Sequence, residues 1–225
     1  MIEVKNLVKT FKDGPLETRV LKGINFTAAN GEFIAIMGRS GAGKSTLLYQ
    51  ISLLDEPTSG EIRINGKEAH KMSEREKMLF RLAEFGYVFQ DYALLPELTA
   101  LENVALPLYM QGASRAAADA KATTALERVG LGKVLKNLPS QLSGGEQQRV
   151  SISRAIAHTP DVLFADEPTA NLDKESSAIV MGIFKELHKG GQTIIMVTHE
   201  EEFSKFAERV VKLDDGKIVS DAHQS

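Results

Sequence analysis

A glycine-rich loop directly behind an apolar strand constrains the fold of this chain more than any other feature of its sequence. Residues Phe33–Met37 form a continuous apolar run, which is typical of a parallel strand buried on both faces. The run leads into Gly38-Arg39-Ser40-Gly41-Ala42-Gly43-Lys44-Ser45-Thr46, which has the residue spacing of a phosphate-binding loop. A helix is predicted from Lys44 to about Leu53, so the strand–loop–helix context that this motif requires is complete.

The residue types in this loop suit the phosphates of a nucleotide. Glycines permit backbone angles at which amide groups approach phosphate oxygens closely, and the helix N-terminus adds a favourable dipole. We expect Lys44 to neutralise the β- and γ-phosphates and the Ser45 hydroxyl to ligate Mg²⁺. The residues assigned to nucleotide binding are Gly38, Ser40, Gly41, Ala42, Gly43, Lys44, Ser45 and Thr46. An ordinary glycine turn that opens a helix is the alternative, and the spacing and context argue against it.

Two carboxylates follow a second apolar strand at residues 162–165. Asp166 and Glu167 stand at its carboxyl end, where open α/β sheets collect their ligands. We expect Asp166 to hold Mg²⁺, directly or through water, and Glu167 to polarise the attacking water as general base. A solvated acidic strand end is the alternative, and the phosphate loop in the same chain argues against it.

The rest of the chain alternates between strand patterns and helix patterns. Strands are predicted at residues 2–7, 20–27, 32–37, 61–65, 87–89, 162–165, 193–197 and near 216–219. Helices are predicted at 73–82, at 113–129 and from the N-cap Asp173 to Gly190, with Ile179, Ile183 and Leu187 on one face. This alternation is typical of a parallel, doubly wound sheet. Residues 91–159 lack convincing strands and are predicted to form a helical subdomain, inserted into a core of residues 1–90 and 160–225.

Composition places the chain among ordinary globular proteins. Its 225 residues are 43% hydrophobic and 25% charged, so it can bury a core without disulfides, and it contains no cysteine. The net charge of −3 supplies no general attraction for nucleic acid, and we expect no nucleic-acid partner. The chain starts with a strand pattern rather than a targeting segment, and no apolar stretch approaches the ~20 residues that cross a bilayer. We therefore expect that the chain does not span a membrane itself, which leaves docking on a membrane protein open.

A second glycine-rich segment, Leu142-Ser143-Gly144-Gly145-Glu146-Gln147-Gln148-Arg149, has a different physical character. Ser143 can cap a helix, and together with Glu146 it fits a capping box. Gly144 and Gly145 in the first turn leave amide groups accessible, which suits a γ-phosphate. Taken alone, the segment is also compatible with a capped helix that merely begins with glycines.

This segment resembles the signature of ATP-binding cassette (ABC) proteins, and its companions follow in the order that the family requires. Phe11 resembles the aromatic residue that stacks on adenine, Gln90 the Q-loop glutamine, and His199 the switch histidine that contacts the γ-phosphate. The segment Ala170-Asn171-Leu172-Asp173 resembles the D-loop. Each residue also has a plainer interpretation when taken singly: a core aromatic for Phe11, an exposed loop glutamine for Gln90, a helix cap for Asp173 and a structural histidine for His199. The histidines without such context, predicted to be non-functional, are His70, His158, His188 and His223.

The resemblance covers nearly the whole chain and implies the ABC ATPase fold of the P-loop NTPases. That fold is α/β, with a mixed sheet core, an antiparallel β subdomain and the inserted helical subdomain that carries the signature. The implied activity is ATP hydrolysis with ATP and Mg²⁺ as cofactors. The implied catalytic residues are Lys44, Gln90, Glu167 and His199, and the implied metal ligands are Ser45, Gln90 and Asp166. Phe11, Ser143, Gly144, Gly145 and Asp173 are implied to join the phosphate loop in nucleotide binding.

The resemblance also implies partners. Two copies are expected to form an ATP-dependent, head-to-tail homodimer, in which the Ser143–Gly145 face of one subunit completes the nucleotide site of the other. An integral membrane permease is expected to dock near the Q-loop and the helical subdomain. The implied location is cytoplasmic, peripheral on the inner face of the cell membrane.

Four segments resemble the lipoprotein-release and macrolide-efflux group of cassettes (LolD/MacB type): residues 53–60, 86–90, 95–104 and 166–173. Ala170 departs from the glycine usual in that group, and Arg39 adds a charge to the phosphate loop. The expected function is to power export, lipoprotein release or transmembrane force transmission through a separate membrane subunit. Two alternatives remain open at this point, a regulatory ABC ATPase that controls cell-wall enzymes without transport, and a soluble ABC ATPase.

Overall fold

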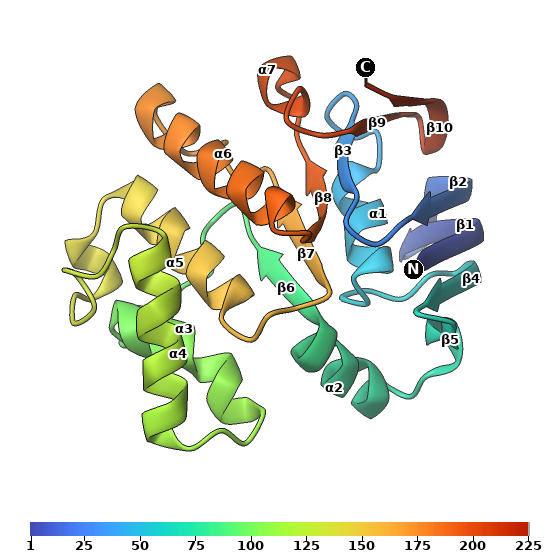
Figure 1. The fold of residues 1–225 in the computed structure, drawn as a ribbon. Helices are drawn as coiled ribbons and strands as arrows, with labels where there is room; N and C mark the ends of the chain where they lie inside the picture. Colours follow the sequence, from blue (N-terminus) through green and yellow to red (C-terminus); the bar gives the residue numbers. More distant parts are fainter. Residues whose placement is uncertain (225) are drawn as a thin grey trace. The chain divides into compact units, whose positions relative to one another are not determined.

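The computed structural model describes residues 1–224 and divides the chain into two compact units, which Figure 1 lets the reader follow by residue colour. The first unit combines Met1–Arg81 with the chain from Gly191 onward, and the second unit is Leu82–Gly190. The helical subdomain at 91–159 was defined by its lack of strand patterns and not by compactness. The division into two units therefore does not test its bounds, which stay a prediction. Within residues 1–224, no helix is both long and apolar enough to cross a membrane.

The first unit opens with an antiparallel sheet whose strands lie in the order β2-β1-β4-β5. These are β1 (Ile2–Asp13), β2 (Leu16–Ala28), β4 (Ser59–Ile64) and β5 (Lys67–Glu68). The β1–β2 hairpin is longer than predicted: its ladder continues to pair Phe11 with Thr18, although no side chain in residues 8–20 is buried. Backbone pairing holds this outer part of the hairpin, so the hydrophobic pattern did not reveal it.

The first unit also contains neighbouring strands in the order β10-β9-β3-β8. β3 (Phe33–Met37) runs parallel to β8 (Thr193–Val197) and β9 (Arg209–Asp214), and β10 (Lys217–His223) returns antiparallel to β9. The sheet is therefore mixed, as the family resemblance implies, and not wholly parallel as the alternation of elements suggests. The tight turn at Asp215 and Gly216, which both have positive φ, produces the reversal.

Three helices and a 3₁₀ turn complete the elements of the first unit. α1 (Lys44–Ile51) follows β3 and contacts β1, β2 and β8. The turn η1 (Ala69–Lys71) precedes α2 (Glu74–Glu84), which contains the boundary between the units, and α7 (Glu201–Ser204) follows β8. The short α1 is thus packed against strands on its own unit while its N-terminus stays at the glycine-rich loop.

The second unit pairs two parallel strands with a helical region. β6 (Phe85–Val88) lies beside β7 (Val162–Asp166). Between them the chain forms α3 (Ala100–Met110), α4 (Arg115–Arg128), the 3₁₀ turn η2 (Pro139–Gln141) and α5 (Gly144–Ile156). No strand lies between residues 89 and 161, a stretch that is described throughout, which agrees with the sequence pattern. α3, α4 and α5 share a core that includes Ala105, Leu108, Ala118, Ala122, Leu126 and Val150.

Helix α6 (Lys174–Lys189) shows how far the predicted apolar face of Ile179, Ile183 and Leu187 is buried. Its buried residues are Ser177, Val180, Met181, Phe184 and Leu187, whereas Ile179 is 44% exposed. The buried stripe is centred on Val180 and Phe184, so Leu187 lies at its margin and Ile179 faces away from it. The predicted apolar face is thus buried only in part: Leu187 is buried, Ile183 packs partly buried against the helical core, and Ile179 is exposed.

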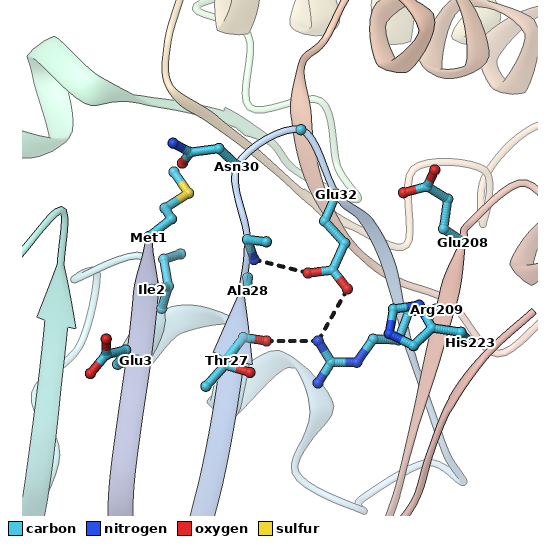
Figure 2. Close-up of a pocket in the computed structure, with 12 residues that line it drawn as sticks. Met1, Ile2, Glu3, Thr27, Ala28, Asn30, Glu32, Glu208, Arg209 and His223 are labelled. Atoms are coloured by element: carbon cyan, nitrogen blue, oxygen red, sulfur yellow. Dashed lines mark hydrogen bonds and ion pairs between the residues drawn. The ribbon is translucent and has the colours of Figure 1, made fainter.

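An ion-pair cluster around Arg209 fixes the C-terminal strand β10 within the first unit, and Figure 2 shows the bonds of Arg209 to Glu32 and Thr27. Arg209 is only 9% exposed, and it donates to both carboxylate oxygens of Asp221 at 2.6 and 2.7 Å, to Glu32 at 3.1 Å and to the Thr27 carbonyl at 3.0 Å. The Arg209 guanidinium lowers the pKa of Asp221 below its usual value. The cluster borders a cavity of about 550 Å³, but every guanidinium nitrogen already donates to protein oxygens. The cavity lies before the start of β3, whereas the phosphate loop follows its end, so this is an anchor and not a ligand site.

Candidate functional site

The phosphate loop in the first unit has a backbone that only glycine adopts easily. Gly38, Gly41 and Gly43 have φ values of 151°, 77° and 98°. A Cβ atom at Gly38 would lie 2.2 Å from the Leu213 carbonyl oxygen, and one at Gly43 would lie 3.0 Å from the Leu21 side chain. Both the conformation and the space therefore require glycine in a loop that bends tightly between β3 and α1.

The N-terminus of α1 is open in the way that an anion site requires. Its N-cap is Gly43, no side chain caps it, and its first turn contains no acidic residue. Lys44 is only 8% exposed, and its ammonium group donates to the Arg39 carbonyl across the loop at 3.1 Å. Bare amide groups, the helix dipole and a lysine held at the loop together suit a polyphosphate.

His199 lies at the same edge of the sheet as the phosphate loop. It follows β8, whose Val197 is paired with Ile36 of β3, and the Thr198 amide donates to the Ile36 carbonyl at 3.2 Å. His199 itself is exposed. The first unit therefore places the loop and this histidine on neighbouring parallel strand ends, and the contact of His199 with a γ-phosphate stays a prediction.

Phe11 lies near the tip of the β1–β2 hairpin. Its side chain is 46% exposed, so the interpretation as an ordinary core aromatic is wrong. The Lys9 ammonium lies 4.9 Å from the centre of the Phe11 ring. A half-exposed ring on the first unit is compatible with base stacking.

In the second unit, β6 and β7 bring three predicted residues to one edge. Val88 is paired with Ala165, so Gln90 and the pair Asp166–Glu167 follow neighbouring parallel strand ends. Asp166 is 5% exposed, and Glu167 has a φ of 48°, which is strained for a residue with a side chain. Strain of this kind is concentrated at functional sites, which supports the assignment of Glu167 without establishing its role.

The Q-loop and the D-loop contact each other within the second unit. The Asn171 side-chain amide donates to the Gln90 carbonyl at 3.0 Å, and the Tyr92 hydroxyl donates to the Asn171 carbonyl at 3.4 Å. Asp173 caps α6 by accepting from the Ser176 amide at 2.7 Å, which confirms the predicted cap. The contacts of Asn171 and Tyr92 escaped sequence reasoning, because no local pattern links residues about eighty positions apart in sequence.

The signature segment forms the capped helix start that its sequence predicts. The Ser143 amide donates to the Glu146 carboxylate at 2.8 Å, and the Glu146 amide donates to the Ser143 hydroxyl at 3.3 Å. The Ser143 hydroxyl also donates to this carboxylate at 2.9 Å, and the two bonds that the carboxylate accepts, led by the one from the Ser143 backbone, lower the pKa of Glu146 below its usual value. Further along α5, the buried Gln148 donates to the Pro168 carbonyl at 2.7 Å, which ties the helix to the segment behind Glu167.

Gly144 and Gly145 both lie close to neighbouring side chains. A Cβ at Gly145 would lie 2.6 Å from the Ser176 hydroxyl oxygen, and one at Gly144 would lie 3.0 Å from the Tyr92 hydroxyl oxygen. Sequence reasoning explained these glycines by access for a phosphate. The contacts with α6 and the Q-loop are an additional reason, and nothing local in the sequence signals them.

Residues 1–224 contain no group of three or more His, Cys, Asp or Glu side chains that could by itself hold a metal ion. The ligand set implied by the resemblance is of another kind, with the Ser45 hydroxyl, the Gln90 amide oxygen and the Asp166 carboxylate. Such oxygen donors fit Mg²⁺, which completes its coordination with phosphate oxygens and water rather than with an all-protein cage. Two of the remaining histidines bond to backbone: His70 to Ile62, and the partly buried His158 to Phe85.

Comparisons with known proteins identify the family. The sequence profile described as "ABC transporter" matches residues 21–170. An uncharacterized ABC transporter ATP-binding protein of Methanocaldococcus jannaschii (MJ1508) is 50% identical over 219 residues, covering 97% of this chain and 98% of that protein. The lipoprotein-releasing system ATP-binding protein LolD of Aquifex aeolicus is 48% identical over 202 residues, covering 90% of each chain. The macrolide export ATP-binding/permease protein MacB of Chlorobaculum tepidum is 45% identical over 221 residues. This match covers 98% of this chain but only 34% of MacB.

A solved structure has the same fold. The ATP-binding cassette MJ0796, as a dimer in a post-hydrolysis state bound to ADP and Pi, superposes with a TM-score of 0.93 at 38% sequence identity, covering 99% of this chain and 98% of that one. The sequence and the fold of the chain that carries the phosphate loop, the carboxylate pair and the signature thus both match ATP-binding cassettes. The chain belongs to the ABC transporter family, as an ATPase cassette of the LolD/MacB type.

Proposed function

We propose that this chain binds ATP with Mg²⁺ at its phosphate loop, hydrolyses it in a head-to-tail dimer and thereby drives a membrane subunit. The observation that carries the proposal is the uncapped N-terminus of α1 behind three positive-φ glycines, with Lys44 held across the loop. This arrangement suits a polyphosphate and has little other chemical use. The matching cassette MJ0796 was solved with ADP and Pi bound, which supports the same ligand class here.

The proposed roles follow the positions of the residues. Lys44 neutralises phosphate oxygens, while Ser45, Gln90 and Asp166 hold Mg²⁺, which when bound would neutralise the charge that develops on the phosphates. Glu167 accepts a proton from the attacking water, and His199 contacts the γ-phosphate. The strained φ of Glu167 supports its role, because the surrounding structure must hold it in place.

The dimer accounts for the signature segment. Its helix start is capped by its own residues, with Ser143 exposed and Gly144 partly exposed, whereas Gly145 is buried. We propose that this face closes over the nucleotide of the opposing subunit, and that Phe11 and Asp173 belong to the same composite site. The dimeric form of MJ0796 supports this proposal.

A membrane subunit is the proposed target of the ATPase cycle. LolD is named for a lipoprotein-releasing system, and MacB combines an ATP-binding and a permease part, of which this chain matches about a third. We propose that this chain works with a permease that docks near Gln90 and the helical subdomain, on the cytoplasmic face of the membrane. Lipoprotein release, export and transmembrane force transmission share this requirement.

The Glu167→Gln variant tests the catalytic proposal. It should retain ATP binding, lose turnover by about 100-fold or more, and accumulate as an ATP-bound dimer in size-exclusion chromatography. Glu175→Gln is a matched control, since Glu175 is an exposed carboxylate on the first turn of α6 and has no proposed role. Rapid multi-turnover hydrolysis by Glu167→Gln would contradict the base assignment.

Mixing two inactive variants tests the composite site. Ser143→Arg should abolish hydrolysis with ATP affinity largely kept, because it acts on the opposing subunit's nucleotide, and Lys44→Ala should lose nucleotide binding. A mixed dimer contains one intact site, made of the loop from one chain and the signature from the other, so mixing should restore part of the activity. A mixture that stays inactive, or a Ser143→Arg monomer that no longer binds ATP, would refute the arrangement.

An affinity pull-down with Glu167→Gln and ATP from detergent-solubilised native membranes tests the partner. Recovery of a permease with few spans and a large outer domain is the expected result. Recovery of cell-wall regulators would favour a regulatory ATPase without transport. The absence of any membrane partner in several detergents would favour a soluble ATPase.

A further inference from the structure

The half-exposed Phe11 ring has a cation fixed over one of its faces. Lys9 and Phe11 are both on β1, and the Lys9 ammonium lies 4.9 Å from the ring centre, within the range of a cation–π interaction. The Lys9 side chain is only 12% exposed, in contrast to the 46% exposure of Phe11. A largely covered ammonium beneath a half-exposed ring defines an inner and an outer ring face.

Lys9 is held in place by groups other than the ring. Its ammonium donates to the Asp55 carboxylate at 2.7 Å and to the Glu56 carbonyl at 2.6 Å. The same carboxylate accepts from the Glu56 amide at 2.8 Å and from the Gln50 side-chain amide at 2.8 Å. The position of the cation is therefore determined before any base is bound.

This network reaches the helix of the phosphate loop. Gln50 is fully buried in α1, the helix that opens with Lys44. On the other side, Lys9 is paired with Leu21 in the β1–β2 ladder, and the Leu21 side chain would lie 3.0 Å from a Cβ at Gly43. The ring and the phosphate loop are thus fixed to each other through packed groups on both sides of Lys9.

We propose that Lys9 is a positioning residue, which holds the Phe11 ring as a one-sided stacking platform for the base of the nucleotide. The inference rests on the proposed binding of ATP at the phosphate loop. Lys9 attracts the inner face of the ring, and its own anchors on Asp55 and Glu56 keep it from moving into the space of the base. The outer face of Phe11 then meets the base, by stacking alone, because phenylalanine has no polar atom.

Two ligands, one with a base and one without, distinguish positioning of the Phe11 ring from a general effect of Lys9 on the phosphate loop. ATP carries a base, and inorganic tripolyphosphate carries only the phosphates. Lys9→Met removes the cation with little loss of side-chain volume, and its dissociation constant for ATP should rise by about three- to fivefold. Its dissociation constant for tripolyphosphate should not change, because the phosphate loop is untouched.

Three further variants sharpen the test by calorimetry. Lys9→Arg keeps a cation over the ring and should recover most of the ATP affinity. Lys12→Met removes a lysine of the same hairpin that is 70% exposed and paired with Glu17, and should change neither ligand's affinity. In the Phe11→Leu background, Lys9→Met should have no further effect on ATP, since the platform that it positions is gone.

Specific results would overturn the inference. Unchanged ATP affinity in Lys9→Met would show that the cation does not position the ring. Equal weakening of ATP and tripolyphosphate would assign Lys9 to the loop or to folding instead. A wild-type protein that binds neither ligand would refute the proposed function itself, and this inference with it, whereas binding of both ligands keeps the two questions separate.

Discussion

The phosphate loop and the signature segment are both rich in glycine, but the two regions need glycine for different reasons. In the loop, Gly38, Gly41 and Gly43 all have positive φ, so the backbone conformation demands them. Gly144 and Gly145 have ordinary helical backbone in α5, and here close neighbours limit the space for a side chain instead, at Gly145 more than at Gly144. Glycine is therefore needed for its backbone conformation in one motif and for its small size in the other.

The helices that follow the two glycine motifs, α1 and α5, also begin differently. α1 begins without a side-chain cap, whereas α5 has a complete capping box of Ser143 and Glu146. The loop leaves backbone donors for a ligand, and the signature satisfies part of its donors internally. This difference fits a division of labour in which the loop binds the phosphates and the signature closes over a nucleotide that is already bound.

The largest loss of stability is expected at Gly38, where both the backbone conformation and the lack of space require glycine. Gly38→Ala places a Cβ 2.2 Å from a backbone carbonyl at a φ of 151°, so the loop or β9 must move. We expect a loss of about 3 kcal/mol or more in the free energy of unfolding, and no ATP binding. Urea denaturation and calorimetry measure the two effects.

Gly41→Ala is the matched control for this prediction. Gly41 also has positive φ, but nothing lies within 4 Å of its Cβ position. Only backbone strain remains, about 1–2 kcal/mol. Equal losses for the two variants would show that the clash at Gly38 contributes nothing.

The next loss of stability, that of Gly145→Ala, should be smaller, and unlike the loss at Gly38 a second substitution should partly reverse it. A Cβ at Gly145 would lie 2.6 Å from Oγ and 2.9 Å from Cβ of Ser176, which is a side chain and can be removed. Gly145→Ala should cost about 1–3 kcal/mol in the free energy of unfolding, and Ser176→Gly in the same chain should recover part of it. A double-mutant cycle with no coupling would contradict the packing explanation.

These contrasts mark what the sequence could predict. The buried strand Phe33–Met37, the loop behind it and the Ser143–Glu146 cap are local patterns, and the structure confirms each of them. The outer β1–β2 hairpin was missed because its pairing carries no buried side chains. The shared face of Ile179, Ile183 and Leu187 was predicted, but spacing alone does not say which of these residues the fold buries. The contacts of Gly145 with Ser176 and of Tyr92 with Asn171 join distant positions, so only the fold reveals them.

Gly144 offers a milder version of the same test. A Cβ there would lie 3.0 Å from the Tyr92 hydroxyl oxygen, the far end of a side chain that can give way. Gly144→Ala should cost less than about 1 kcal/mol in the free energy of unfolding, and Tyr92→Phe in the same chain should remove the clash. If Gly144→Ala costs as much as Gly145→Ala, the distance to the neighbour does not decide the outcome.

The smallest effect should come from acid, and it should distinguish the two helix starts. Glu146 has a lowered pKa because it accepts from the Ser143 backbone and side chain, so its contribution to stability is present above the unfolded pKa and is lost as the pH falls through the folded one. Below about pH 4 the α5 cap should weaken, by less than about 0.5 kcal/mol since the carboxylate is largely solvated.

Amide hydrogen exchange measures this difference at each helix start. The protection factors of the first amides of α5 should fall with acid in the wild type and stay nearly constant in Glu146→Gln, which keeps the cap geometry but does not titrate. The first turn of α1 contains no acidic side chain, so its amides should behave alike in both proteins. A pH response confined to α1, or the same response in both variants, would mean that the carboxylate does not hold the signature helix, and that the contrast between the two glycine motifs lies in their backbones alone.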